Sequence, residues 1–157
     1  MAGKSEMAPE RGDKECDMSD LPISPAAMRV ARPVADIAES LRFYVETLGL
    51  RHLGGFDDHE GYSGAFVGME GADWRLEFTS QAGGSTVGAP TDEDLLVLYL
   101  SAEQLHAAGA RLTEAGVQTL RHENPYWAQA SALVFRDPDG YLLVLCPVEG
   151  LRPVFDY

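Results

Sequence analysis

The feature that most constrains the fold of this chain is an order of predicted elements that occurs twice. In each half, the hydrophobic pattern predicts a strand, then an amphipathic helix that ends at a glycine, then three further strands. The first copy covers residues 27–80 and the second residues 94–148. A repeated β-α-β-β-β unit predicts a pseudo-symmetric α+β fold of two βαβββ modules. Each module has one helix to cover one face of its sheet, so the other face must meet a partner copy or form a ligand groove.

Signals for helix ends frame the first module. Asp36 is a predicted N-cap with Glu39 at the capping-box spacing, and Gly49 is the predicted C-terminal stop. The residues between them place apolar side chains at helical intervals. The predicted strands of this module are Met28–Val34, Arg51–Phe56, Gly64–Gly68 and Trp74–Thr79.

The second module follows the same plan with different residues. Ser101 is a predicted helix cap with Gln104 at the box position, and Gly116 ends the helix as Gly49 ends the first. The tetrapeptide Asp137–Gly140 (DPDG) predicts a hairpin turn, because proline presets φ and glycine accepts a positive φ. The predicted strands are Asp94–Leu100, Val117–Leu120, Ala132–Arg136 and Tyr141–Cys146.

Three segments lie outside the predicted modules. Residues 1–26 are polar and lack periodicity, which predicts a flexible tail. Residues 81–93 are rich in Gly, Ser, Thr and Pro and are expected to form a linker. Residues 149–157 form a C-terminal extension, and its apolar side chains pack either on a neighbouring molecule or on the chain's own body.

Composition excludes several classes of function. The formal net charge of −13 has the wrong sign for a phosphate-binding surface, so nucleic acid is not an expected partner. The same negative charge would draw cationic ligands towards a cleft. The sequence contains neither an apolar run that could span a membrane nor a secretory signal. Cys16 and Cys146 are too few and too far apart for a disulfide framework or a zinc cluster. We therefore expect a cytoplasmic protein with free thiols.

Two groups of residues resemble the vicinal oxygen chelate superfamily, which includes glyoxalases, bleomycin-resistance proteins and dioxygenases. The strings Val34–Asp36, Ser40–Tyr44 and Leu48–Leu50 are similar to the signature of its first module, and Phe135–Tyr141 is similar to the last hairpin of its second. Further similarity to a bacterial branch lies in Val30–Pro33, Asp58–Tyr62 and Asn124–Trp127. The resemblance covers residues 28–148 and implies a curved mixed sheet around a cleft, the glyoxalase/bleomycin-resistance/dioxygenase fold.

The resemblance also implies a site to test, because enzymes of this superfamily usually hold one divalent metal for Lewis-acid chemistry. The four ligand positions correspond here to Arg29, Glu77, Leu95 (or Asp94, one residue earlier) and Val144. Arginine has no lone pair to offer a metal, and two aliphatic side chains have none either. With Glu77 alone remaining, we expect neither a metal site nor another cofactor.

The same positions suggest a different chemistry for three tentative catalytic residues. Arg29 and Glu77 should lie on adjacent strands and form a partly buried ion pair where the metal would sit. This pair either neutralises a polar hole in the groove, or binds a substrate carboxylate or enolate with Glu77 as base or orienting partner. His59, which is surrounded by acidic residues, is either a general acid or a simple turn residue.

The residues expected to contact a ligand are mostly aromatic. The string Asn124–Trp127 contains a tyrosine and a tryptophan side by side in a predicted loop. Their rings either line the cleft mouth or pack against the sheet. The predicted ligand-binding residues are Arg32, Tyr62, Tyr99, Asn124, Tyr126 and Trp127.

Three functions remain open on this basis. The first is a metal-independent protein that binds a small molecule, as the bleomycin-resistance branch binds a drug or metabolite. The second is a divergent glyoxalase-like lyase or isomerase that uses Glu77 and Arg29. The third is a non-catalytic protein with an occluded groove. A C2 homodimer is the expected assembly in each case.

Overall fold

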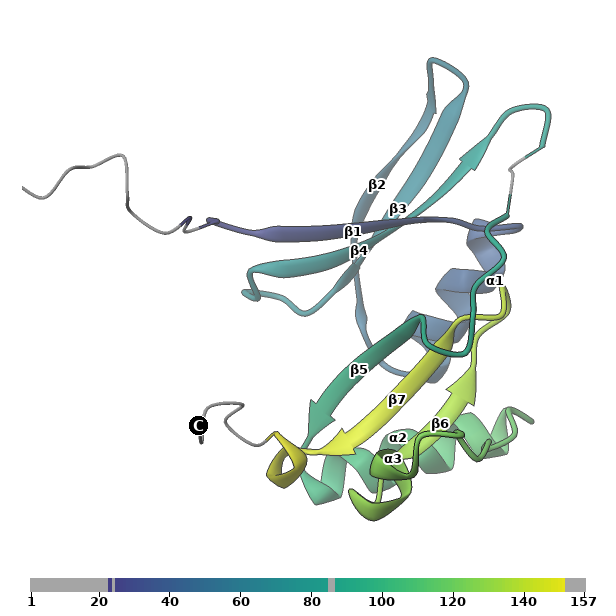
Figure 1. Cartoon of the computed structure of the whole chain (residues 1–157). Helices are drawn as coiled ribbons and strands as arrows, with labels where there is room; N and C mark the ends of the chain where they lie inside the picture. Colours follow the sequence, from purple (N-terminus) through teal and green to yellow (C-terminus); the bar gives the residue numbers. More distant parts are fainter. Residues whose placement is uncertain (1–22, 24, 85–86, 152–157) are drawn as a thin grey trace, which may run out of the picture.

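The fold consists of two sheets, each with the strand order that a βαβββ module produces (Figure 1). The computed structural model describes residues 23, 25–84 and 87–151. In each sheet the first strand of the module runs parallel to the last and the remaining pairs are antiparallel, which confirms the predicted α+β class with two related modules. The first sheet contains β1 (Met28–Pro33), β4 (Trp74–Gln81), β3 (Tyr62–Gly68) and β2 (Arg51–His59), in that order. The second contains β5 (Leu95–Leu100), β7 (Leu142–Pro147) and β6 (Leu133–Arg136), in that order.

The helices begin and end largely where the sequence places them. Asp36 accepts hydrogen bonds from the first turn of α1, and Ser101 and Gln104 form the complete capping box of α2. Gly49 and Gly116 follow the two helices with positive φ, as C-terminal stops. The helical elements are α1 (Ile37–Leu41), its π-helical continuation η2 (Arg42–Thr47), α2 (Ala102–Glu114), α3 (Pro125–Gln129) and the 3₁₀ turn η3 (Val148–Gly150). Within the described part of the chain, no helix has the length and apolar character that a membrane span requires.

Two local predictions in the second module are wrong. The strand expected at Val117–Leu120 is reduced to one bridge, Leu120 to Val134, beside β6. The loop expected at 124–127 is the start of α3, because the Asn124 side chain accepts the Tyr126 N–H at 3.0 Å and caps a helix. Pro125 at its first position needs no hydrogen-bond donor there.

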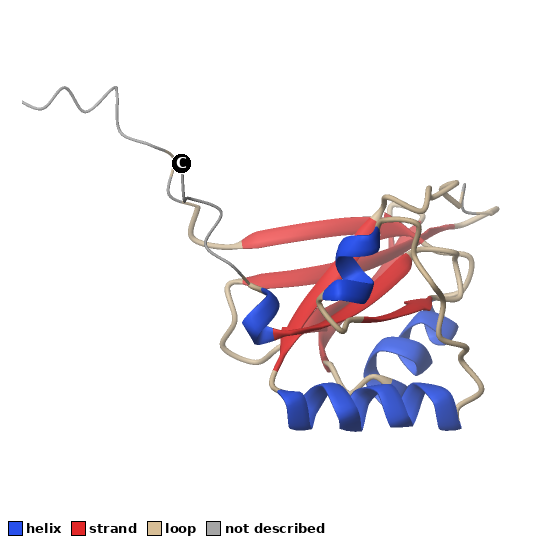
Figure 2. Cartoon of the chain, turned by 60° about the horizontal axis from the view of Figure 1, so that its bottom comes forward, coloured by secondary structure: helices blue, strands red, loops and turns tan. Residues whose placement is uncertain are grey.

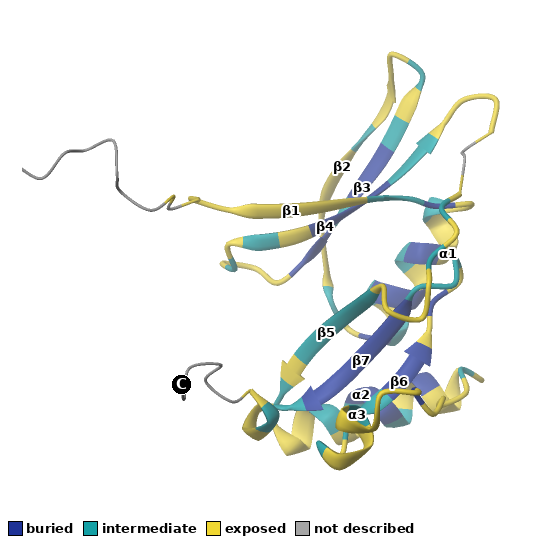
Figure 3. Ribbon diagram, in the orientation of Figure 1, coloured by how far each residue is buried: buried dark blue, intermediate teal, exposed yellow. Residues whose placement is uncertain are grey.

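One hydrophobic core joins the two modules. The inner face of the first sheet (Leu76, Phe78) and the face of the second that carries Leu143 and Leu145 both contribute to it. Both helices also contribute, and Leu112 of α2 has no exposed surface. Figure 3 shows buried colour concentrated in β6 and β7, whereas β1 and β2 are largely exposed. Figure 2 shows α2 running below the strands as the longest helix in the view.

Polar contacts hold the helix of the first module against the second module. The Tyr44 hydroxyl donates to Asp137 at 2.7 Å, and the Ala35 N–H donates to Asp139 at 2.8 Å. At the other end of the helix, Arg111 of α2 donates to the carbonyls of residues 47 and 48 at 3.0 and 2.8 Å. The two strings that carry the superfamily resemblance, around Tyr44 and around the DPDG turn, therefore contact each other.

Candidate functional site

Strand register places several polar and aromatic side chains on the outer face of the first sheet. Arg29 is paired with Arg75 and Phe66 with Glu77, and residues paired across a sheet project to the same side. Because Leu76 alternates with these residues and faces the core, the paired set faces away from it. We call this surface the open face and define it by Arg29, Phe56, Phe66, Arg75 and Glu77.

The ion pair expected between Arg29 and Glu77 is present. Arg29 Nε lies 3.0 Å from Glu77 Oε2, and the two side chains are 56% and 8% exposed, respectively. A carboxylate this deeply buried needs its cation to compensate the charge that water no longer solvates. The Arg29 guanidinium keeps nitrogen atoms at the surface. The pair therefore fixes a guanidinium group on the open face with donors available to a ligand.

Aromatic rings form the floor beside this pair. The Phe66 ring centroid lies 5.9 Å from Arg29 Cζ and 5.7 Å from Arg75 Cζ, so two guanidinium groups flank one ring. The Phe56 ring centroid lies 6.1 Å from that of Phe66. Phe56 fits only because residue 64 is glycine: a Cβ at Gly64 would lie 2.5 Å from the Phe56 ring.

The β2–β3 hairpin brings His59 and Tyr62 to one end of the open face. The His59 ring centroid lies 6.5 Å from that of Phe56, and both His59 and Tyr62 are exposed. Within the described residues, no hydrogen bond or ion pair joins His59 to Arg29 or Glu77. The structure thus places the three tentative catalytic residues on one sheet but joins only two of them directly.

Arg32 lies on the other side of β1, at the junction between the modules. Its Cζ is 4.2 Å from the centroid of the Tyr141 ring, and its buried Nη1 has no hydrogen-bond partner among the described residues. Beside it, burial and the neighbouring Asp137 raise the pKa of Tyr44 well above its usual value, and burial raises the pKa of Asp137. Arg32 therefore belongs to the contact between the modules rather than to the open face.

The other predicted ligand-binding residues lie on the second module. Tyr99 is partly exposed, and burial is the main cause of its raised pKa. Asn124 caps α3, the Tyr126 hydroxyl donates to the Gly150 carbonyl at 2.9 Å, and Trp127 packs over the second sheet. Asn124 and Trp127 therefore each have a structural role, and their contact with a ligand stays a prediction.

An apolar groove of 370 Å³ separates the edge strands β1 and β5. Met28, Val30 and Trp74 line it from the first sheet, opposite the side chains of Leu96–Leu100 from the second. Sequence reasoning did not assign Met28, Val30 or Trp74 to a site. Met28 and Val30 are apolar residues on the edge strand β1, and Trp74 lies beside them at the start of β4.

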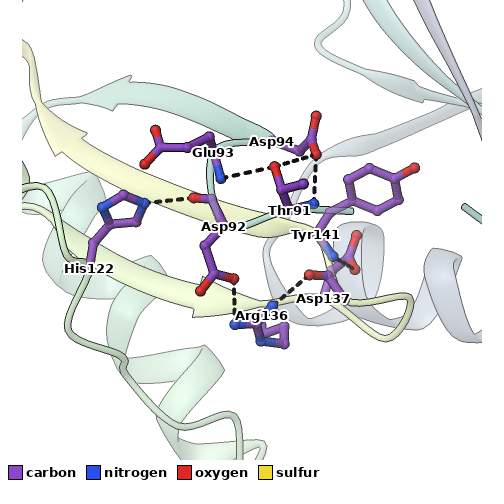
Figure 4. Close-up of polar contacts among 9 residues, drawn as sticks. Thr91, Asp92, Glu93, Asp94, His122, Arg136, Asp137 and Tyr141 are labelled. Carbon is purple, nitrogen blue, oxygen red and sulfur yellow. Dashed lines mark hydrogen bonds and ion pairs between the residues drawn. The ribbon is translucent and has the colours of Figure 1, made fainter. Parts of the chain in front are cut away.

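The four positions that the superfamily resemblance assigns to metal ligands do not fit a divalent ion here. Glu77 is engaged by Arg29, and Val144 is fully buried beneath Trp127. The alternative donor Asp94 accepts hydrogen bonds from the backbone N–H and hydroxyl of Thr91, which lower its pKa (Figure 4). Among the described residues no three His, Cys, Asp or Glu side chains are grouped to hold a metal.

His122 also has a structural role, and Figure 4 shows its contact with Asp92. Its Nδ1 accepts the Asn124 N–H at 2.9 Å, so Nε2 carries the proton and donates to the Asp92 carbonyl at 2.7 Å. Arg136 adds an ion pair to Asp92 at 3.0 Å. Both ring nitrogens of His122 are thus occupied in holding the linker to the loop before α3.

Comparison with known proteins places the chain in a family. The YycE-like N-terminal domain matches residues 28–79 and the YycE-like C-terminal domain matches residues 93–147. The uncharacterized protein YycE of Bacillus subtilis is 40% identical over 127 residues, which cover 80% of this chain and 91% of that protein.

Solved structures agree with this assignment. A crystal structure of a YycE protein of unknown function from B. subtilis has a TM-score of 0.74 at 37% identity, covering 84% of this chain and 94% of that one. TnmS3, an antibiotic-binding protein from Streptomyces sp. CB03234, has a TM-score of 0.59 at 29% identity and covers 81% and 98% of the two chains. The glyoxalase I of Leishmania major shares the fold, with a TM-score of 0.65 at 21% identity over 80% and 88% of the chains. The chain belongs to the YycE-like family, within the vicinal oxygen chelate superfamily of glyoxalases and bleomycin-resistance proteins.

Proposed function

We propose that this protein binds a small organic molecule, a drug or a metabolite, on the open face of its first sheet, without a resident metal and in the cytoplasm. The observation that carries the proposal is the Arg29–Glu77 ion pair, at two positions that the superfamily resemblance assigns to metal ligands. A guanidinium held by a buried carboxylate offers fixed hydrogen-bond donors, and the rings of Phe56 and Phe66 offer apolar area beside it. The antibiotic-binding protein TnmS3, similar in fold and sequence, supports a binding role.

Ligand-induced stabilisation tests this function. A thermal-shift screen against antibiotics and small oxo-acids should yield compounds that raise the melting temperature, because a ligand at 100 times its Kd adds about 2.7 kcal/mol to the unfolding free energy. Phe66→Ala should abolish each shift by removing the floor of the site. Elemental analysis of the purified protein should detect no stoichiometric zinc or nickel. Absence of any shift across the library would instead favour an occluded, non-binding groove.

A lyase or isomerase reaction is the second candidate, favoured by the burial of Glu77 beside a cation. In this role Glu77 removes a proton next to a carbonyl and Arg29 holds the enolate oxygen that forms. Incubating hits of the screen in D₂O tests the idea by NMR, since a base of this kind exchanges the proton for deuterium. Exchange that is lost in Glu77→Gln would support catalysis, whereas binding without exchange would leave the protein a binder.

We propose in addition that the chain forms a homodimer through the groove between β1 and β5. Both strands are sheet edges, and Met28, Val30 and Tyr99 expose apolar surface there. Sedimentation equilibrium should give twice the chain mass, and Val30→Glu should give a folded monomer. A monomeric wild-type protein would contradict the proposal.

A further inference from the structure

We infer that the ligand of the open face is an organic anion with a flat apolar part, whose oxyanion group is bound by Arg75 beside Arg29. This inference rests on the proposed binding function and adds a ligand class to it. Nothing in the net charge suggests it, because a chain of net charge −13 favours cations in general. The charges that favour an anion lie on the first sheet.

Two like charges face each other across the sheet. Arg29 on β1 is directly paired with Arg75 on β4, and like charges in this position repel. Glu77 compensates Arg29 at 3.0 Å, whereas Arg75 has no ion-pair partner in the part of the chain that the structure describes. The open face therefore carries one more cation than anion, and an added anion would relieve the repulsion.

The aromatic floor determines the rest of the ligand. The two guanidinium carbon atoms lie 5.9 and 5.7 Å from the centroid of Phe66, so an oxyanion shared between them sits beside this ring. Phe56 continues the apolar surface away from the arginines. A flat ring attached to the anionic group would lie along the two phenylalanines and bury apolar surface there.

The acidic residues of the β2–β3 hairpin do not cancel the charge of Arg75. Asp57 accepts the Ser63 hydroxyl at 2.8 Å, and Asp58 and Glu60 lie in the hairpin at the other end of the sheet from Arg75. Within the described residues, none of the three forms an ion pair with Arg75. Glu70 and Asp73, in the turn just before β4, likewise form no ion pair with Arg75 among the described residues, so no ion pair there compensates its charge.

Three probes of one shape test the inference: 1-naphthoate, 1-naphthamide and 1-naphthylmethylamine, with charges of −1, 0 and +1. Their affinities are measured by NMR titration of the backbone amides of β3 and β4. At low ionic strength the naphthoate should bind about fivefold more tightly than the amide, the effect of one charge-assisted contact at a surface. Salt should reduce this preference by screening.

Variants assign the preference to the arginine. Arg75→Gln should bring the naphthoate and naphthamide affinities together, because the naphthoate loses more affinity than the neutral amide. Arg121→Gln, at an exposed site on the second module, is the matched control and should keep the wild-type preference.

The possible outcomes distinguish the assignment of an anionic ligand from the proposed binding function. Equal affinities, tighter binding of the amine, or a preference that survives Arg75→Gln would overturn the anion assignment while the binding function stands. Failure of all three probes to shift the amides of β3 and β4 would overturn both.

Discussion

At the scale of single residues, Glu77 and Arg29 differ most in how much they depend on each other. Glu77 is almost fully buried, so removal of Arg29 leaves its charge without compensation. Arg29 is half exposed, so water can replace part of the hydrogen bonding and charge compensation that Glu77 gives it. The pair is therefore asymmetric, and the two single substitutions should not cost the same free energy.

Arg29→Met should lower the free energy of unfolding by about 2 kcal/mol, a value reduced from that of a fully buried pair because Arg29 is half exposed. Glu77→Gln should cost less, since a neutral amide still accepts a hydrogen bond from the guanidinium. Urea denaturation of both variants measures the two changes. Arg75→Gln is the control, expected within about 0.5 kcal/mol of wild type; an equal loss in all three variants would mean that the pair has no special role.

At the scale of elements, a glycine determines how β2 and β3 carry the aromatic floor. Gly64 lies under the Phe56 ring, with atoms of that ring 2.5 and 2.6 Å from the position of an added Cβ. The carbonyl of Phe78 is 3.3 Å from the same point, so the backbone leaves no room to shift inward. The position of Phe56 thus depends on the absence of a side chain on the neighbouring strand.

Gly64→Ala should displace Phe56, lower the unfolding free energy by about 1–3 kcal/mol through overpacking, and weaken binding at the open face. The matched background is Phe56→Ala, in which the clash has been removed. In that background Gly64→Ala should cost little, so the double-mutant cycle should give a coupling energy above about 1 kcal/mol. Additive effects would show that the ring does not depend on Gly64.

The element scale also shows where prediction from sequence succeeded and failed. Helix starts were predicted correctly at Asp36 and Ser101 because an N-cap is a local interaction, complete within four residues. The same local signal is present at Asn124 before Pro125, where the prediction was a loop and the structure has a capped helix. The strand at 117–120 failed because pairing depends on where β6 lies, which no local pattern specifies.

At the scale of the whole molecule, the helix of the first module is fastened to the second by the Tyr44–Asp137 bond of 2.7 Å. Burial raises the pKa of Asp137, while hydrogen bonds from Tyr44 and from the backbone N–H groups of Tyr141 and Asp139 partly oppose the rise. A raised folded-state pKa means that the contribution of Asp137 to stability is present below its unfolded pKa. It is lost as the pH rises through the folded value.

Tyr44→Phe should therefore destabilise the protein in a pH-dependent way. Without the Tyr44 hydroxyl, ionised Asp137 loses a hydrogen-bond donor and its pKa rises further. The loss in the free energy of unfolding should be about 1–3 kcal/mol at pH 7. It should be smaller near pH 4, because the carboxyl group is protonated in more of the folded molecules there. Urea denaturation at the two pH values measures the difference. Asp137→Asn should remove the pH dependence of the Tyr44→Phe cost; its persistence would assign the effect to another group.

The sequence by itself determined the number and order of the modules and most helix ends, since these follow from short-range patterns. The resemblance to the superfamily added the Arg29–Glu77 pair, which the structure shows at 3.0 Å. At two of the four positions that the superfamily resemblance assigns to metal ligands, the sequence has Arg29 and Val144, whose side chains offer no lone pair to a metal. Only the tertiary structure decided that Arg32 turns to the junction with Tyr141, that His122 holds the linker through the Asp92 carbonyl, and that Arg75 joins Arg29 beside Phe66. These are contacts between strands and modules distant in sequence, and their geometry depends on how the two sheets pack, which no local pattern encodes.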